Sequence, residues 1–253
     1  MAVFITGASS GIGQALAWEY ARGGHVVGLV ARRGDRLHDL IDRLPGGRHK
    51  AYVVDVTDRV ALHAAAHDFE RHVGVVDIVI ASAGVSAGTL TETGEDFEVF
   101  RDIFAINVLA TMATFEPFIP GMKQRRQGTL VGIASVAGVR GLPGAGAYSA
   151  SKAAVKTYCE SLRVELGGSG VDVVTVAPGY VQSEMTAHNP YAMPFLLPAQ
   201  EFARRCVRAI DRRPGYVVIP WQMAIVASIM ACLPDWLYDR LSRNAPRKPR
   251  RVT

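Results

Sequence analysis

The strongest constraint on the fold lies at the start of the chain, where an apolar run leads into a glycine-rich segment and then into a helix-favouring one. The apolar run is Val3-Phe4-Ile5, and three glycines follow it at positions 7, 11 and 13. Gly7 permits a tight turn, Gly11 lets backbone N–H groups approach a pyrophosphate, and Gly13 lets the helix pack closely on the strand. The order of strand, glycine turn and helix predicts the first βαβ unit of a parallel sheet, with a nucleotide phosphate site at the helix N-terminus.

Short apolar runs alternate with helix-favouring segments along the rest of the chain. Most of the runs are continuous, which is typical of parallel strands covered on both faces. Strands are expected near residues 2–6, 26–30, 51–54, 76–80, 128–134, 171–177 and 216–219, and helices near 12–23, 35–43, 58–72, 96–125, 147–167 and 200–211. The alternation predicts an α/β fold: a doubly wound, mostly seven-stranded parallel sheet with helices on both faces, as in Rossmann-like proteins.

Length and composition fit one large core. The chain has 253 residues, 49% of them hydrophobic, with no linker and no internal repeat. We expect a single domain over residues 1–242, including a substrate lid at about 185–198 and a C-terminal apolar helix at about 221–233, followed by a basic, disordered tail at 243–253. The first strand begins close to Met1 and leaves no room for a signal peptide, so a cytoplasmic protein is expected.

The cysteines and the charge argue against two classes of function. Cys159, Cys206 and Cys232 are far apart in apolar, helix-like contexts, so we expect small buried side chains and no metal site. The formal net charge of +5 owes much to the tail, and no aromatic residues are interleaved with the basic ones as stacking platforms. No nucleic-acid partner is expected.

Tyr148 and Lys152 lie four residues apart, on one face of an expected helix. A nearby ammonium favours the phenolate and lowers the phenol pKa from its usual value of about 10, so the pair is a candidate proton-transfer device. Ser135 ends an apolar strand thirteen positions before Tyr148, where its hydroxyl would hold a substrate oxygen beside the phenol. Taken alone, a Tyr–Lys pair at this spacing is more often a solvated helix face.

Taken in order, these motifs resemble the short-chain dehydrogenase/reductase family in its short single-domain form. The resemblance covers nearly the whole chain: Thr6 to Gly13, Asp55-Val56, Ser82-Ala83-Gly84, Asn107, Ser135, Tyr148, Lys152 and Pro178-Gly179-Tyr180-Val181. It implies that Ser135, Tyr148 and Lys152 are catalytic and that Asn107 completes a tetrad, positioning Lys152 through a water. It also implies hydride exchange between a nicotinamide and a carbon whose oxygen exchanges a proton with Tyr148.

The resemblance further implies a set of cofactor contacts along one edge of the sheet. They are Gly7, Ser9, Ser10, Gly11, Ile12, Gly13, Arg32, Arg33, Asp55, Val56, Ser82, Ala83, Gly84, Tyr148, Lys152, Pro178, Gly179, Val181 and Ser183. Two of these positions depart from the family pattern. Ser82 replaces the usual asparagine and reaches less far, so it is expected to brace the sheet less, whereas Ser183 replaces a threonine and keeps the hydroxyl.

The segment after the second strand, Ala31-Arg32-Arg33, indicates the cofactor. A carboxylate there would bind the ribose 2′-hydroxyl and repel a 2′-phosphate, whereas guanidinium groups pair well with phosphate oxygens. The sequence therefore predicts NADP(H) in preference to NAD(H), with Arg32 as the main contact. The alternative for Arg33 is a solvated surface arginine.

The substrate is expected to meet the irregular segment at 185–198, which is rich in proline and apolar residues. Tyr191, Met193, Phe195 and Leu196 are candidate pocket walls, and they suit a hydrophobic ketone, aldehyde or alcohol. The alternative is that these side chains simply pack on the body of the protein.

The sequence also bears on binding partners and on an alternative function. The apolar helix at 221–233 is too short to cross a membrane, and burial, dimer contact and shallow membrane contact beside the basic tail all stay open. A homodimer or homotetramer is implied only by analogy, through the helices at 96–125 and 147–167. A sensor or scaffold that binds NADP(H) without turnover is the alternative to an NADP-dependent enzyme; the chain keeps every catalytic group, which favours the enzyme.

Overall fold

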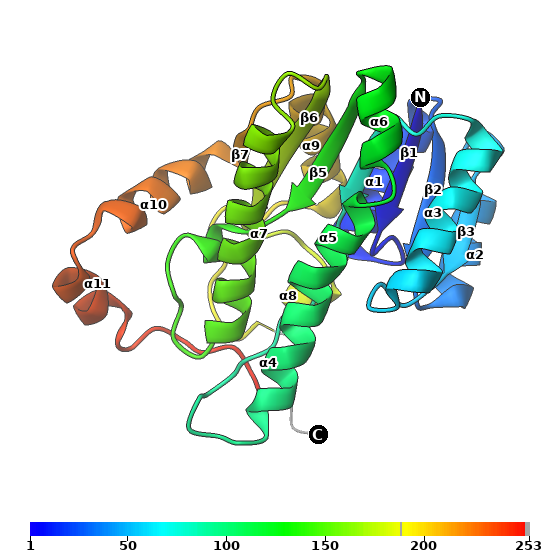
Figure 1. Cartoon of the computed structure of the whole chain (residues 1–253). Helices are drawn as coiled ribbons and strands as arrows, with labels where there is room; N and C mark the ends of the chain where they lie inside the picture. The colour runs from blue at the N-terminus through cyan, green and yellow to red at the C-terminus, as the bar shows by residue number, and fades with distance from the viewer. Residues whose placement is uncertain (188, 251–253) are drawn as a thin grey trace.

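The computed structural model describes residues 1–187 and 189–250; His188 of the predicted lid and residues 251–253 of the predicted tail lie outside the described residues. Seven parallel strands form one sheet in the order β3-β2-β1-β4-β5-β6-β7 (Figure 1). Their bounds are β1 Ala2–Thr6, β2 Val26–Ala31, β3 Lys50–Val53, β4 Ile78–Ala81, β5 Gly128–Ile133, β6 Val171–Pro178 and β7 Tyr216–Ile219. The predicted doubly wound sheet is confirmed.

Helices cover both faces of this sheet, which explains why its central strands are continuously apolar. On one face Leu16 and Phe202 pack with Ile5, and on the other Phe69 and Phe115 pack with Phe4. The first face carries α1 (Gly11–Arg22), α2 (Gly34–Arg43) and α9 (Ala199–Asp211), and the second carries α3 (Arg59–Val73), α5 (Ala110–Phe115), α6 (Ile119–Arg125) and α7 (Gly146–Glu165).

The helix predicted over 96–125 is in fact interrupted. α4 (Asp96–Phe104) passes into a π-helical segment, η1 (Ala105–Leu109), before α5 begins. The π-helical segment carries Asn107, whose side chain pairs with the backbone of Val85. Pro117, which has no N–H to donate, lies between α5 and α6. Polar side-chain contacts and a proline therefore shape a run whose hydropathy alone predicted one long helix.

The run Asp96–Arg125 is the one stretch of helix in the described chain that is long and apolar enough to span a membrane. It covers the sheet, however, and the side chain of Phe115 within it is fully buried in the core. We therefore assign it to the protein interior.

Beyond β7 the chain forms two helices that extend from the edge of the sheet (Figure 1). α10 (Trp221–Cys232) begins after Pro220 and ends before Pro234, within the predicted apolar helix, whereas α11 (Asp235–Ser242) was not predicted. Cys232 is exposed, contrary to the expectation of three buried thiols. The large side chains at 221, 225 and 229 of α10 are exposed as well.

Part of the segment predicted as a disordered tail makes side-chain contacts in the described chain. Residues 247–250 lie against the body of the protein, because Lys248 bonds to Ser86 and Arg250 pairs with Asp96. Each of these pairs joins residues more than 150 positions apart, so no local sequence signal predicts it.

Candidate active site

A cleft of about 520 Å³ opens at the carboxyl edge of the parallel strands, where ligands bind in doubly wound sheets. It is lined by every residue predicted to contact the cofactor and by Ser135. These residues come from the ends of β1, β2, β3, β4, β5 and β6, from the first turn of α1 and from the first two turns of α7. Of the predicted catalytic residues, Asn107 alone is not part of the lining.

The glycine turn gives the phosphate end of the cleft its shape. Gly7 has a φ of 71°, and a Cβ there would lie 2.7 Å from Cα of Ala83. A Cβ on Gly13 would overlap the carbonyl oxygen of Gly7, so the helix and strand pack as closely as predicted. α1 begins at Gly11 without a side-chain cap, which leaves its first N–H groups free to bind a pyrophosphate. The cradle therefore fits a dinucleotide.

Thr6 braces this turn in a way that the sequence did not indicate. Its hydroxyl oxygen accepts hydrogen bonds from the backbone N–H groups of Ser82 and Ala83, at 3.2 and 3.3 Å. Ser82 stands where the family usually has asparagine. The backbone beside Ser82 is thus tied to β1 through Thr6.

Ser135, Tyr148 and Lys152 meet on one wall of the cleft. Ser135 follows β5 and caps a short 3-10 turn, η2 (Val136–Gly138), and its hydroxyl is close enough to Tyr148 to influence the pKa of the phenol. Lys152 lies one helical turn after Tyr148 on α7, and its Nζ is 5.9 Å from the centre of the tyrosine ring. That Nζ donates a hydrogen bond of 2.8 Å to the carbonyl oxygen of Ile133.

The pKa of Tyr148 moves in the direction opposite to the one expected. Burial of the hydroxyl raises this pKa, and the neighbouring hydroxyl of Ser135 opposes the rise. The same burial lowers the pKa of Lys152, which is 6% exposed, to about 8. Because burial disfavours the charged form of both groups, a neutral phenol is the stable form at neutral pH.

Asn107 supports the site from behind the cleft. Its Oδ1 accepts from the N–H of Val85 at 2.8 Å, and its Nδ2 donates to the carbonyl oxygen of Val85 at 3.0 Å and to Ser151 Oγ at 2.9 Å. This side chain thereby links the loop after β4 to α7. Gly84 leaves room for it, since a Cβ there would lie 3.3 Å from Asn107 Oδ1 and 3.5 Å from Lys152 Nζ. Ser151 had no predicted role.

The predicted arginines differ in their surroundings. Arg33 is anchored to the glycine turn: its Nε donates to Ser9 Oγ at 3.2 Å, and another guanidinium nitrogen donates to Ser10 Oγ. The same guanidinium pairs with Glu184 at 2.7 Å. Arg32, the favoured contact, is more exposed and lies 3.4 Å from Asp55. Arg33 is therefore better fixed in the cleft than Arg32.

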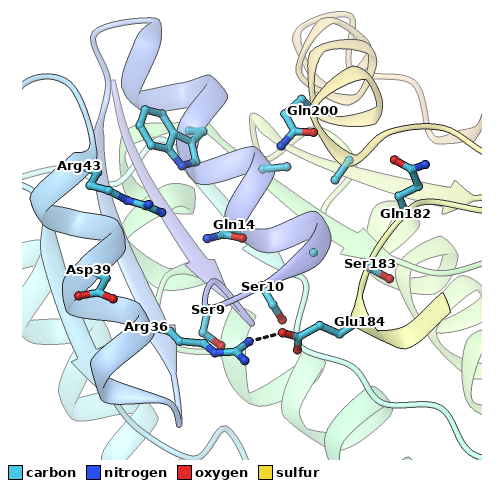
Figure 2. A pocket seen from close by; sticks show the side chains of 14 residues that line it. Ser9, Ser10, Gln14, Arg36, Asp39, Arg43, Gln182, Ser183, Glu184 and Gln200 are labelled. Atoms are coloured by element: carbon cyan, nitrogen blue, oxygen red, sulfur yellow. Dashed lines mark hydrogen bonds and ion pairs between the residues drawn. The ribbon is translucent and has the colours of Figure 1, made fainter. Parts of the chain in front are cut away.

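Glu184 is an acidic residue that the sequence analysis missed. It begins α8 (Glu184–Ala187) and pairs with both Arg33 and Arg36. Figure 2 shows the pair with Arg36 at one side of a polar hollow of about 620 Å³ beside α1. Hydrogen bonds from the two arginines hold the pKa of Glu184 below its usual value. The carboxylate of Glu184 is thus bound to the guanidinium of Arg33, which was predicted to contact the cofactor phosphate.

The four predicted pocket walls, Tyr191, Met193, Phe195 and Leu196, are not among the residues that line the cleft. The phenol of Tyr191 is nevertheless close enough to Tyr148 to contribute to the raised pKa of that residue. The segment instead returns to the body beside Tyr180: the N–H of Leu197 donates to the Tyr180 carbonyl oxygen at 3.0 Å. Phe195 is about half exposed.

Among the described residues, no group of three His, Cys, Asp or Glu side chains is arranged to hold a metal ion. The fold and the cleft define the class of protein: a Rossmann-type nucleotide-binding protein with a Ser–Tyr–Lys set at the binding edge.

Comparisons with known proteins narrow this class. A family model described as short chain dehydrogenase matches residues 1–193. An uncharacterized oxidoreductase of Myxococcus xanthus is 39% identical over 242 residues, which is 95% of each chain. The chain belongs to the short-chain dehydrogenase/reductase family and is an oxidoreductase of that family.

Two solved structures share the fold but carry different cofactors. A short-chain dehydrogenase/reductase from Burkholderia phymatum in complex with NAD has a TM-score of 0.82 at 24% identity and covers 99% of this chain and 98% of its own. A serine dehydrogenase complexed with NADP+ has a TM-score of 0.76 at 26% identity, covering 87% and 92%. The family binds nicotinamide dinucleotides, and its fold accommodates either form.

Proposed function

We propose that this protein is an NADP(H)-dependent oxidoreductase that interconverts a carbonyl and a secondary or primary alcohol, with Tyr148 as the acid and base. One observation carries the proposal. Ser135, Tyr148 and Lys152 line the same cleft as the glycine turn, and the Ser135 hydroxyl is close enough to the tyrosine to influence its pKa. Proton-transfer groups and a pyrophosphate cradle therefore open onto one cavity.

The bound nicotinamide would supply or accept the hydride at the reacting carbon. In reduction, the Tyr148 hydroxyl donates its proton to the substrate oxygen, and the Ser135 hydroxyl hydrogen-bonds that oxygen as it becomes negative. The raised pKa of Tyr148 keeps this proton available at neutral pH. Lys152 would hold the nicotinamide ribose, and Asn107 fixes the helix that carries both Tyr148 and Lys152.

The preference for NADP(H) is supported by the guanidinium groups of Arg32 and Arg33 at the end of β2, where no carboxylate follows the strand directly. A serine dehydrogenase of similar fold binds NADP+. Glu184 weakens the preference, because it competes with a 2′-phosphate for Arg33.

Family members act on small molecules, and we propose a largely apolar carbonyl compound or alcohol as the substrate. We also propose that the protein acts in the cytoplasm as a homodimer or homotetramer. The exposed apolar side chains Phe97, Leu109 and Val164 on the helix layer around α4 and α7 support subunit pairing there.

A screen of carbonyl compounds tests the function. Oxidation of NADPH and of NADH would be followed with a panel of aldehydes, aliphatic and aromatic ketones, steroids and 3-oxoacyl compounds. The proposal expects turnover with at least one compound and a higher kcat/KM for NADPH. Tight NADPH binding without turnover of any member would favour the alternative, a sensor or scaffold.

Shallow membrane contact is a second, separate proposal, and it rests on α10. Trp221, Ile225 and Ile229 are each more than half exposed and recur every four residues, so they form one apolar helix face. Co-sedimentation with anionic vesicles tests this. Binding that survives the double substitution Ile225→Asp, Ile229→Asp would contradict it.

A further inference from the structure

Residues 245–250, which we call the strap, run back from α11 beneath α7 towards α4 (Figure 1). The N–H of Gly88 donates to the carbonyl oxygen of Pro249 at 2.9 Å. The guanidinium of Arg250 donates two hydrogen bonds, of 2.8 and 3.0 Å, to the carboxylate of Asp96. The strap is thus joined by its backbone and by a charged pair to the segment that follows β4.

This attachment is specific. The Asp96 side chain is 4% exposed and also accepts from the N–H of Leu90 at 2.7 Å. Hydrogen bonds from Arg250 lower the pKa of Asp96, so the pair stays ionised at neutral pH. Gly88 must be glycine here, because a Cβ would overlap the carbonyl oxygen of Lys248.

The strap brings a second ammonium group to the tyrosine of the active site. Lys248 Nζ donates to Ser86 Oγ at 2.8 Å and lies 5.9 Å from the centre of the Tyr148 ring. Both Ser86 and Tyr148 line the cleft. The Nζ atoms of Lys248 and Lys152 are therefore equally far from the centre of the Tyr148 ring.

The charge of Lys248 is not matched within the described part of the chain. No carboxylate described here lies within ion-pair distance of its Nζ, in contrast to Arg250 two residues later. An ammonium has three N–H donors, and Ser86 is the one acceptor found for Lys248 among residues 1–187 and 189–250. Lys248 is thus a partly buried cation beside two residues that line the cleft, with donors for which the described chain offers no further acceptor, and such a group is suited to bind an anion.

We propose that Lys248 determines substrate specificity by binding a carboxylate of the substrate, so that the preferred substrates are oxo acids and the corresponding hydroxy acids. The inference rests on the proposed function and refines the substrate from an apolar carbonyl compound to one with an acidic end. The carboxylate lies a few bonds from the reacting carbon, because Nζ is close to the ring that carries the reacting hydroxyl. Reduction leaves the carboxylate unchanged.

Matched pairs of substrates test this directly. Oxidation of NADPH would be measured with 2-, 3- and 4-oxo carboxylic acids and with the methyl ester of each. For at least one pair the intact chain should prefer the acid by about 10- to 100-fold in kcat/KM, the range of a charge-assisted hydrogen bond. Lys248→Met should abolish this preference mainly through KM and leave the ester within about twofold, whereas Lys248→Arg should retain most of it.

Two further variants separate binding by Lys248 from a general effect on folding. Gly88→Ala displaces the strap without changing any charge and should remove the acid preference as Lys248→Met does. Lys156→Met is the matched control, since Lys156 also lies over a tyrosine ring, at 5.3 Å, but that ring belongs to Tyr216, which does not line the cleft. The control should keep the preference.

The outcomes distinguish the two proposals. Equal use of acid and ester by the intact chain, or an equal loss on both in Lys248→Met, would overturn the role of Lys248 and leave the oxidoreductase standing. No turnover with any acid, ester or member of the wider panel would overturn the proposed function and this inference with it.

Discussion

The inner and outer parts of the candidate site are held by different forces. The inner part, Ser135, Tyr148, Lys152 and Asn107, is fixed by sheet, helix and buried hydrogen bonds. The outer part, made of Arg33, Glu184 and the strap, is held by ion pairs, most of them exposed. Burial sets the pKa values and geometry of the first, whereas salt and ligands compete for the contacts of the second. Changes inside should therefore act on turnover and stability, and changes outside on affinity and selectivity.

The largest effect is expected from Lys152→Met, which removes a buried ammonium with little change in volume. We expect kcat to fall by about 10³-fold or more, because the ribose contact and the charge beside Tyr148 are lost together. Lys156→Met, on the same helix, should leave kcat unchanged. Steady-state kinetics would contradict a special inner site if both variants lost activity equally.

Asn107→Leu should lower both stability and activity. The backbone N–H and C=O of Val85 and the hydroxyl of Ser151 lose their partner, which costs roughly 2–4 kcal/mol of unfolding free energy for buried polar groups. Thr111→Val removes one hydrogen bond to the same π-helical segment and should cost only about 1 kcal/mol. Urea unfolding of the two variants would contradict this ranking if their midpoints were equal.

The lowered pKa of Lys152 predicts a pH-dependent stability. In the folded chain Lys152 loses its proton near pH 8, whereas in the unfolded chain it keeps it to about pH 10.5. The unfolded state therefore binds more protons in this window, and stability rises with pH, by roughly 3 kcal/mol in total. Measured without cofactor, the unfolding free energy of Lys152→Met minus that of the unchanged chain should shrink from pH 8 to 10.5. A constant difference would contradict the assigned pKa.

The smallest effect is expected in the outer part. Glu184→Gln frees Arg33 and Arg36 from their carboxylate partner, so NADPH should bind about two- to fivefold more tightly, as expected for exposed ion pairs, with NADH little changed. Glu201→Gln, which removes an acid paired with Arg204 and Arg205 on α9, is the matched control. Weaker NADPH binding in Glu184→Gln would show that Glu184 assists the cofactor.

The division between the inner and outer parts of the site also explains which features could be predicted from the sequence. Burial patterns and glycine spacing are local, so they predicted all seven strands and the phosphate-binding turn, and the family resemblance implied the other residues that the fold brings to one cleft. The direction of the Tyr148 pKa shift was predicted wrongly, because spacing does not show how deeply two groups are buried. The strap and Glu184 depend on pairs such as Arg250–Asp96 and Glu184–Arg33, which are far apart in sequence and leave no periodic signal.

The central claim is that Tyr148 moves a proton beside a bound nicotinamide, and Tyr148→Phe tests it most directly. NADPH binding, followed by its fluorescence, and single-turnover oxidation of NADPH with a confirmed substrate would be measured on the same preparations. We expect the NADPH dissociation constant to stay within about threefold and hydride transfer to slow by about 10³-fold or more. Hydride transfer at a tenth or more of the original rate would contradict the account.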